Sequence, residues 1–174
     1  MDALDGKDLS ASALQVYQTG DYKNAARLFG EAASVFLAQG NKLDAAEMKN
    51  NESVALLQAG DARGSFEAAH GTAQVFIESG DFRRQGMAFG NEAAAQNALG
   101  RLDEAIVNYK LAAEALEKAG EDQLRAISMQ ALSGVQLRKG KVFDAHCSMR
   151  IGLAGLKQPT FRQKFLLFLL RIRI

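Results

Sequence analysis

The two histidines and the single cysteine of this 174-residue chain are the first side chains to test for chemistry. His146 and Cys147 are adjacent, and His70 stands far earlier in the sequence. A metal ion needs three or four donors at suitable spacing, and these residues do not provide that pattern. A nucleophilic Cys–His pair is equally unsupported, because neighbours on a helix point about 100° apart. We therefore expect neither a metal site nor cysteine catalysis.

Carboxylate pairs occur at Asp103-Glu104 and at Glu121-Asp122. Both pairs fall in the expected first turns of helices, where negative side chains interact favourably with the helix dipole. That role requires no catalysis. The sequence also contains no Walker loop, no Gly-x-Gly-x-x-Gly and no Gly-x-Ser-x-Gly. We therefore expect a protein that is not an enzyme and holds no cofactor.

Glycine stands at every twentieth residue from Gly20 to Gly140, and this spacing predicts a regular series of helices. These helices must position any binding site. Glycine adopts a positive φ without strain, so it suits the residue just past a helix end. Asp or Asn follows the first four of these glycines and can cap the next helix. The pattern predicts helices near residues 8–19, 22–39, 43–59, 62–79, 83–99, 102–119, 122–139, 142–157 and 161–173. Gly71 is expected inside the fourth of these helices.

A shift of forty residues superposes the chain on itself and defines the repeating unit. Small residues recur five positions after every second glycine, at Ala25, Ser65, Ala105 and Ala145. Large apolar residues recur sixteen positions after it, at Phe36, Phe76, Leu116 and Leu156. Small residues let two helices approach closely, and large ones fill the groove beside them. One helix pair cannot bury its apolar face alone, so we expect the units to stack.

The segment Gly100-Arg-Leu-Asp-Glu-Ala-Ile-Val-Asn-Tyr-Lys-Leu-Ala-Ala113 resembles the turn and second helix of the tetratricopeptide repeat (TPR) family. Gly20-Asp-Tyr-Lys-Asn-Ala-Ala-Arg-Leu-Phe29 resembles the same part. The resemblance covers roughly residues 9–156, and the period of forty is longer than the common thirty-four. It implies an all-α fold, a right-handed α-α superhelix of antiparallel helix pairs. The first helix of each pair would line a concave surface where partners bind.

This resemblance places polar residues on the concave surface. They are Asn50, Asn51, Gln58, Asn91, Asn97, Gln130 and Arg138. Carboxamides both donate and accept hydrogen bonds, so paired rungs of Asn and Gln could hold the backbone of an extended peptide. The other interpretation is that these residues are solvated polar positions on an exposed face.

Family members that bind chaperone tails hold a C-terminal carboxylate with Lys, Arg and Asn side chains in this groove. The matching positions here are Ser10, Leu14, Asn51, Met87 and Asn91. Of these, Asn51 fits, and the positive charges are missing. We therefore do not expect chaperone tails to bind by that route.

Charge is unevenly distributed along the chain. Residues 1–136 carry 12 basic and 19 acidic side chains, whereas residues 137–174 carry 9 basic side chains and one acidic residue, Asp144. An apolar stripe follows the C-terminal helix, at Phe161, Phe165, Phe168, Leu169 and Ile172. Three interpretations stay open for this segment: a capping helix with excess apolar surface in a dimer or crystal contact, a helix on an anionic membrane surface, or an artificial or truncated end.

The N-terminal residues are acidic and lack the basic and apolar blocks of a signal peptide. The longest apolar run, from Phe165 to Leu170, is far shorter than the roughly 20 residues that span a bilayer. A single cysteine excludes an intrachain disulfide and fits a reducing compartment. We therefore expect a cytoplasmic protein.

These observations predict two parts: a TPR-like array of about four helix pairs over residues 1–158, and a basic, apolar capping helix over residues 159–174. The predicted function is a non-catalytic scaffold that binds a peptide or protein segment, without a nucleic-acid partner. The alternative is a membrane-peripheral, trafficking-type adaptor that uses residues 161–174, and a homodimer through the C-terminal helix is a further option. A regulatory domain of an enzyme is the least favoured interpretation.

Overall fold

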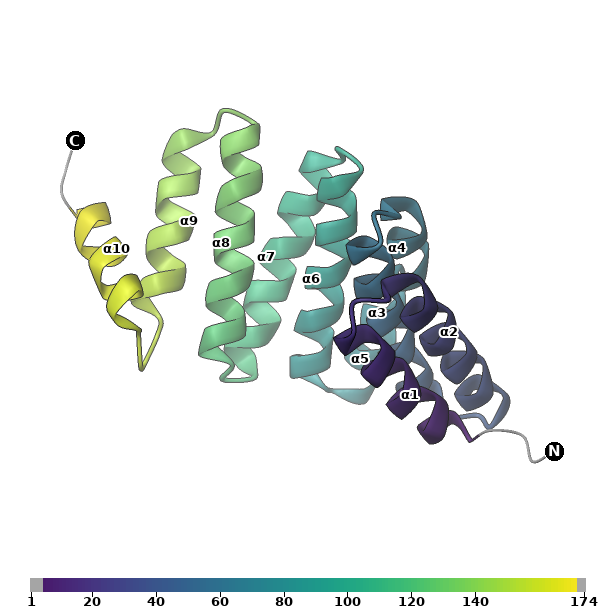
Figure 1. The fold of residues 1–174 in the computed structure, drawn as a ribbon. Helices are drawn as coiled ribbons and strands as arrows, with labels where there is room; N and C mark the ends of the chain where they lie inside the picture. Colours follow the sequence, from purple (N-terminus) through teal and green to yellow (C-terminus); the bar gives the residue numbers. More distant parts are fainter. Residues whose placement is uncertain (1–4, 172–174) are drawn as a thin grey trace.

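The computed structural model describes residues 5–171, and this range is all-helical with no strand (Figure 1). The helices are α1 (Gly6–Gln18), α2 (Tyr22–Ala38), α3 (Lys42–Gln58), α4 (Ala62–Ala69), α5 (Thr72–Ser79), α6 (Phe82–Ala98), α7 (Leu102–Lys118), α8 (Asp122–Arg138), α9 (Val142–Ala154) and α10 (Phe161–Arg171). The helices pack in chain order, so they form an elongated stack with α1 near one end and α10 at the other. The all-α prediction is confirmed for these residues.

The glycine ladder forms the turns, as predicted. All seven glycines at twenty-residue spacing have a positive φ, between 71° and 87°. Four polar residues then accept a hydrogen bond from the backbone N–H three positions later: Asp21, Asn41, Asp61 and Asp81. Each bond satisfies an N–H group that the start of a helix leaves free. The later helices α7, α8 and α9 begin without a side-chain cap.

The positions that recur every forty residues form the core of every unit. The large apolar positions Phe36, Phe76, Leu116 and Leu156 are all buried. The small positions of the second helices, Ala25, Ser65, Ala105 and Ala145, are buried as well. They pack against small residues of the first helices. In the second unit, for example, the hydroxyl oxygens of Ser65 and of Ser53 on α3 lie 2.9 Å apart. The units are therefore α1–α2, α3–α5, α6–α7 and α8–α9.

The helix predicted over residues 62–79 is broken in the structure, which corrects the prediction. Gly71 has a φ of 81°, so α4 ends before it and α5 begins after it. The Thr72 hydroxyl lies 2.6 Å from the carbonyl oxygen of Ala69 at the end of α4. Apolar residues continue at helical spacing across the break, from Ala69 to Ala73 and Phe76, and this periodicity hides the break in the sequence.

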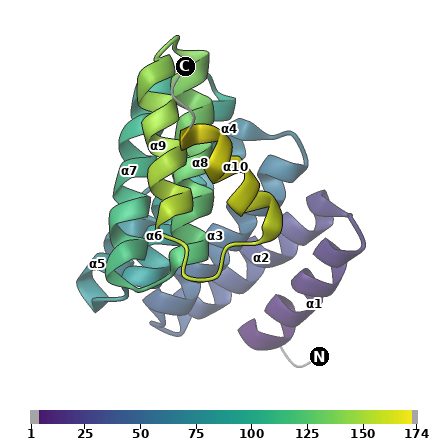
Figure 2. The ribbon, with the colours of Figure 1, turned by 90° about the vertical axis from the view of Figure 1, so that its left-hand side faces the viewer.

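The C-terminal helix α10 lies over the last unit (Figure 2). Leu167 and Leu170 pack against buried Ala126, Leu153 and Leu156 of the preceding segment. The connection contains Pro159, and α9 ends at Ala154, a few residues earlier than predicted. Residues 1–4 of the predicted array and residues 172–174 of the predicted C-terminal segment lie outside the described residues. None of the helices in residues 5–171 combines the length and apolarity needed to cross a bilayer.

Candidate functional site

One stripe of residues repeats on the first helices of the four units. On α1, α3, α6 and α8 it occupies positions i, i+4, i+7 and i+11, which share one face of a helix. We call it the inner stripe, and its members are Lys7, Ala11, Leu14 and Gln18; Glu47, Asn51, Val54 and Gln58; Met87, Asn91, Ala94 and Ala98; and Ile127, Ala131, Gly134 and Arg138. Every one of them is exposed or half-buried.

The first helices of the second, third and fourth units lie side by side. Helix α3 contacts α6, and α6 contacts α8. Within the described residues, no comparable contact joins the second helices α2, α7 and α9 to one another. The units therefore converge on the side of the first helices, and this convergence makes the inner stripe one continuous surface along α3, α6 and α8.

Two hollows open along the inner stripe. The first has a volume of about 140 Å³ and is lined by Leu14, Tyr17, Phe29, Asn51 and Val54. The second has a volume of about 290 Å³ and lies between α6, α7 and α8. Its wall includes the inner-stripe residues Met87, Asn91, Ala94, Ile127 and Ala131. Each hollow therefore combines apolar walls with one asparagine, Asn51 in the first and Asn91 in the second.

Four of the seven predicted site residues belong to the inner stripe. Asn51 and Asn91 are half-buried and line the two hollows. Gln58 and Arg138 stand at the end of their helices and are exposed. The structure thus brings the predicted Asn51 and Asn91 rungs onto neighbouring first helices, one unit apart.

The other three predicted residues lie elsewhere. Asn50 is buried, and its Oδ1 accepts hydrogen bonds from Thr72 Oγ1 at 3.2 Å and from Asn91 Nδ2 at 3.5 Å. Asn97 accepts hydrogen bonds from Arg138 through its backbone oxygen, at 3.0 Å, and through its side chain. Gln130 is exposed and lines a separate hollow of about 160 Å³ between α8, α9 and α10. Asn50 therefore joins two units inside the core.

Sequence reasoning assigned no binding role to the apolar half of the inner stripe. Leu14 is 52% exposed, Met87 38% and Ile127 62%, although all three are large and apolar. The superposition at a shift of forty residues could have revealed these apolar positions, because Met87 and Ile127 occupy the same position of successive units. Sequence reasoning considered Leu14 and Met87 only as matches to the chaperone-tail positions and did not consider Ile127.

Two charged members of the inner stripe, Glu47 and Arg138, already have partners. Glu47 lies 3.0 Å from the guanidinium of Arg84 in the next unit, and Arg84 also contacts Asp81 at 2.6 Å. Hydrogen bonds from the backbone and then the side chain of Arg84 hold the pKa of Asp81 below its usual value. Arg138 is likewise engaged by Asn97. Apolar and amide groups therefore dominate what this part of the stripe offers to a partner.

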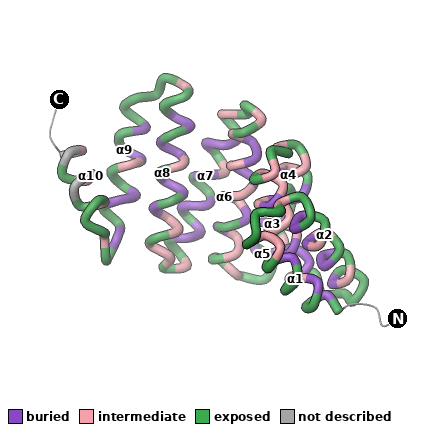
Figure 3. Tube along the Cα trace, viewed as in Figure 1, coloured by how far each residue is buried: buried purple, intermediate pink, exposed green. Residues whose placement is uncertain are grey.

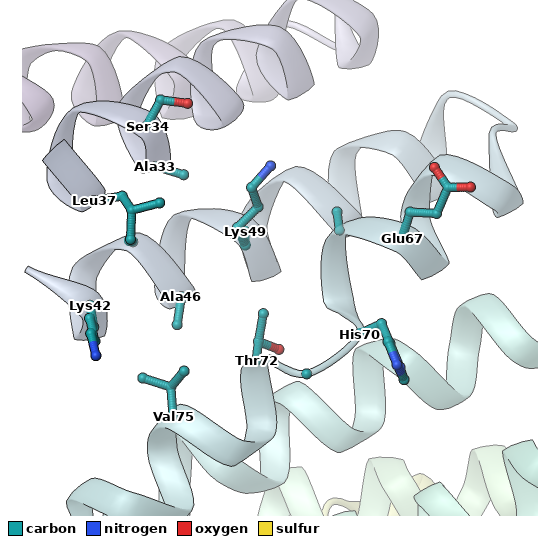
Figure 4. Close-up of a pocket in the computed structure, with 13 residues that line it drawn as sticks. Ala33, Ser34, Leu37, Lys42, Ala46, Lys49, Glu67, His70, Thr72 and Val75 are labelled. Carbon is teal, nitrogen blue, oxygen red and sulfur yellow. The ribbon is translucent and has the colours of Figure 1, made fainter.

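A larger cavity, of about 450 Å³, lies on the opposite face of α3 (Figure 4). Residues of α2, α3, α4 and α5 line it, and they include Leu37, Ala45, Lys49, Gly71 and Val75. The shift of forty explains its origin. Lys49 stands where the next units have Phe89 and Met129, and Gly71 stands where they have Leu111 and Ile151. The second unit therefore has a lysine and a glycine where the two later units have large apolar residues.

A polar chain that is buried at Glu92 and Gln96 joins the second and third units. His70 Nδ1 lies 3.0 Å from Glu92 Oε1, and Glu92 is buried. Gln96 donates to Glu92 at 3.4 Å and accepts from Asn108 at 3.1 Å. Within the described residues, no group of three His, Cys, Asp or Glu side chains is placed to hold a metal ion.

No protein-family model matches this sequence, and no curated protein is significantly similar to it. The TPR resemblance therefore remains an expectation from the residues of this chain.

Proposed function

We propose that this chain is a TPR-like, non-catalytic interaction scaffold that holds a protein or peptide segment along its inner stripe. In this proposal the stack is a right-handed superhelix in the cytoplasm, and the inner stripe lies on its concave face. The observation that carries the proposal is the pair of apolar hollows on the first helices, each bordered by one asparagine.

The two hollows would accept apolar side chains of the bound segment, one between Leu14 and Val54 and the other between Met87 and Ile127. Between these anchors, the Asn51 and Asn91 amides can donate to and accept from the backbone of the segment. A surface built on packed helices loses little conformational entropy on binding, which favours affinity. Because Glu47 and Arg138 are already engaged, recognition depends on apolar and amide contacts.

Affinity capture from an extract of the native cell, followed by mass spectrometry, tests the proposal. Met87→Arg with Ile127→Arg places charge in the larger hollow and should abolish capture of the partner. Asn51→Ala with Asn91→Ala should weaken binding by about thirtyfold, since each of the two lost hydrogen bonds contributes on the order of 1 kcal/mol. Thermal melting of each variant should show that the stack stays folded.

The matched control places arginine on the second helices, at Ile77 and Val107, which are 43% and 56% exposed. These variants should capture the partner as the wild type does. Equal capture by the Met87 and Ile127 variants, or loss of capture by the control variants, would contradict the proposal.

A further inference from the structure

Helix α10 has two faces with different environments. Leu167 and Leu170 face the stack and pack on α8 and α9. Phe161 and Phe168 are 84% and 60% exposed. Figure 3 shows that α10 is largely exposed where it is described. One side of this helix is therefore occupied by the stack, and the other presents aromatic rings to solvent.

The exposed face has an ordered pattern of aromatic and cationic residues. Phe161 and Phe168 are seven residues apart, which is two helical turns, so they share a face. By the same spacing, Arg162 and Lys164 flank this face on its two sides. Both are exposed, and among the described residues neither forms an ion pair. The face therefore has an aromatic centre between two cations.

The C-terminal part of the sequence is strongly cationic. Residues 137–174 carry 9 basic side chains and one acidic side chain. Lys157 is engaged by Asp122 and Lys139 by Asp103, while Arg150 on α9 is exposed. An amphipathic helix with aromatic residues between cations matches an anionic lipid surface, because the rings enter the headgroup boundary and the cations contact phosphates.

Phe143 at the start of α9 is a further exposed aromatic residue in this region, 79% exposed. The corresponding positions of the three earlier units hold charged residues, Lys23, Arg63 and Asp103. Exposed aromatic residues thus accumulate in the cationic end of the chain. A second copy docked face to face would bring two such cationic ends together, and their repulsion disfavours that occupant.

We propose that α10 docks the stack on an anionic lipid surface. Phe161 and Phe168 enter the headgroup region, and Arg162 and Lys164 contact the phosphates. Leu167 and Leu170 keep their contacts with α8 and α9, so docking does not require the helix to leave the stack. The inner stripe stays free for its protein partner, and the two activities are independent.

Flotation of the full chain with vesicles tests this surface. The wild type should float with vesicles that contain phosphatidylserine and stay behind with phosphatidylcholine alone, and added salt should weaken binding because it screens exposed charge. Phe161→Ser with Phe168→Ser should lower partitioning by at least about tenfold through lost apolar burial. Arg162→Gln with Lys164→Gln should lower it by about tenfold through lost attraction to the lipid phosphates.

Matched variants on the second helices provide the control. Leu37→Ser with Val107→Ser removes exposed apolar groups, and Lys23→Gln with Lys110→Gln removes exposed cations. Both should float as the wild type does. Equal binding to neutral vesicles, or equal loss in the control variants, would overturn the proposal. A chain that stays off both vesicles and forms a dimer that Phe168→Ser dissociates would overturn it in favour of a second copy.

Discussion

The second and third units follow the same plan forty residues apart, yet the second helix of one is broken beside a cavity and the second helix of the other is continuous. Both turn at a glycine with positive φ, Gly60 and Gly100, and both bury a large apolar residue, Phe76 and Leu116. In the second unit the second helix is broken into α4 and α5, and a cavity of about 450 Å³ separates it from α2. In the third unit the second helix, α7, is continuous.

The comparison distinguishes positions that lie between the two helices of one unit from positions that lie between neighbouring units. Positions between the two helices of one unit hold small buried residues in both units, as at Ser65 and Ala105, and these let the two helices pack closely. Positions between units differ in size and polarity, as at Lys49 against Phe89 and Gly71 against Leu111. A repeat can therefore keep its stack while its interunit surfaces vary.

The largest expected effect comes from Ala105→Leu, because Ala105 is completely buried between α6 and α7. The extra carbons should destabilise the chain by about 1–3 kcal/mol or more. Ser65→Leu should destabilise the chain at least as much if the paired helices of the two units pack in the same way, since it also removes the contact with the Ser53 hydroxyl. Thermal melting measures both, with exposed Glu104→Leu as the control. An unchanged melting temperature for Ala105→Leu would show that the units are wrongly aligned.

An intermediate effect is expected at the helix break. Gly71 has a φ of 81°, which costs an L-residue about 1–2 kcal/mol, so Gly71→Ala should destabilise the chain. Gly134→Ala lies inside α8, where an added Cβ meets no atom within 4 Å, and it should stabilise by about 0.5–1 kcal/mol. Denaturant unfolding compares the two. A stabilising Gly71→Ala would mean that α4 and α5 form one continuous helix.

The smallest effect should come from filling the cavity. Lys49→Met introduces the residue that stands at the corresponding position of α8, Met129. Burial of the thioether side chain offsets loss of the ion pair with Glu52, so stability should rise by less than about 1 kcal/mol. Lys110→Met on the exposed surface of α7 serves as the control in the same unfolding measurement. A loss of stability at position 49 would show that the space is not open to an apolar side chain.

The sequence predicted the ladder of helices because glycine and its capping partner act locally at each turn. It did not predict the break at Gly71, because the apolar periodicity from Ala69 to Phe76 continues through it. It placed Asn51 and Asn91 on the first helices by resemblance, and these residues line the hollows. It could not show that Asn50 is buried, because burial there depends on Thr72 and Asn91 of other helices.

The central claim is that a protein segment lies along the inner stripe. Photo-crosslinking tests this claim most directly, with a photoreactive residue placed at Gln58 or Ala98 on the inner stripe and at Gln74 or Lys110 on the second helices, all of which are exposed. The account predicts that the two inner positions crosslink to the same partner and that the two outer positions do not. Crosslinking of that partner at the outer positions with none at the inner ones would contradict it.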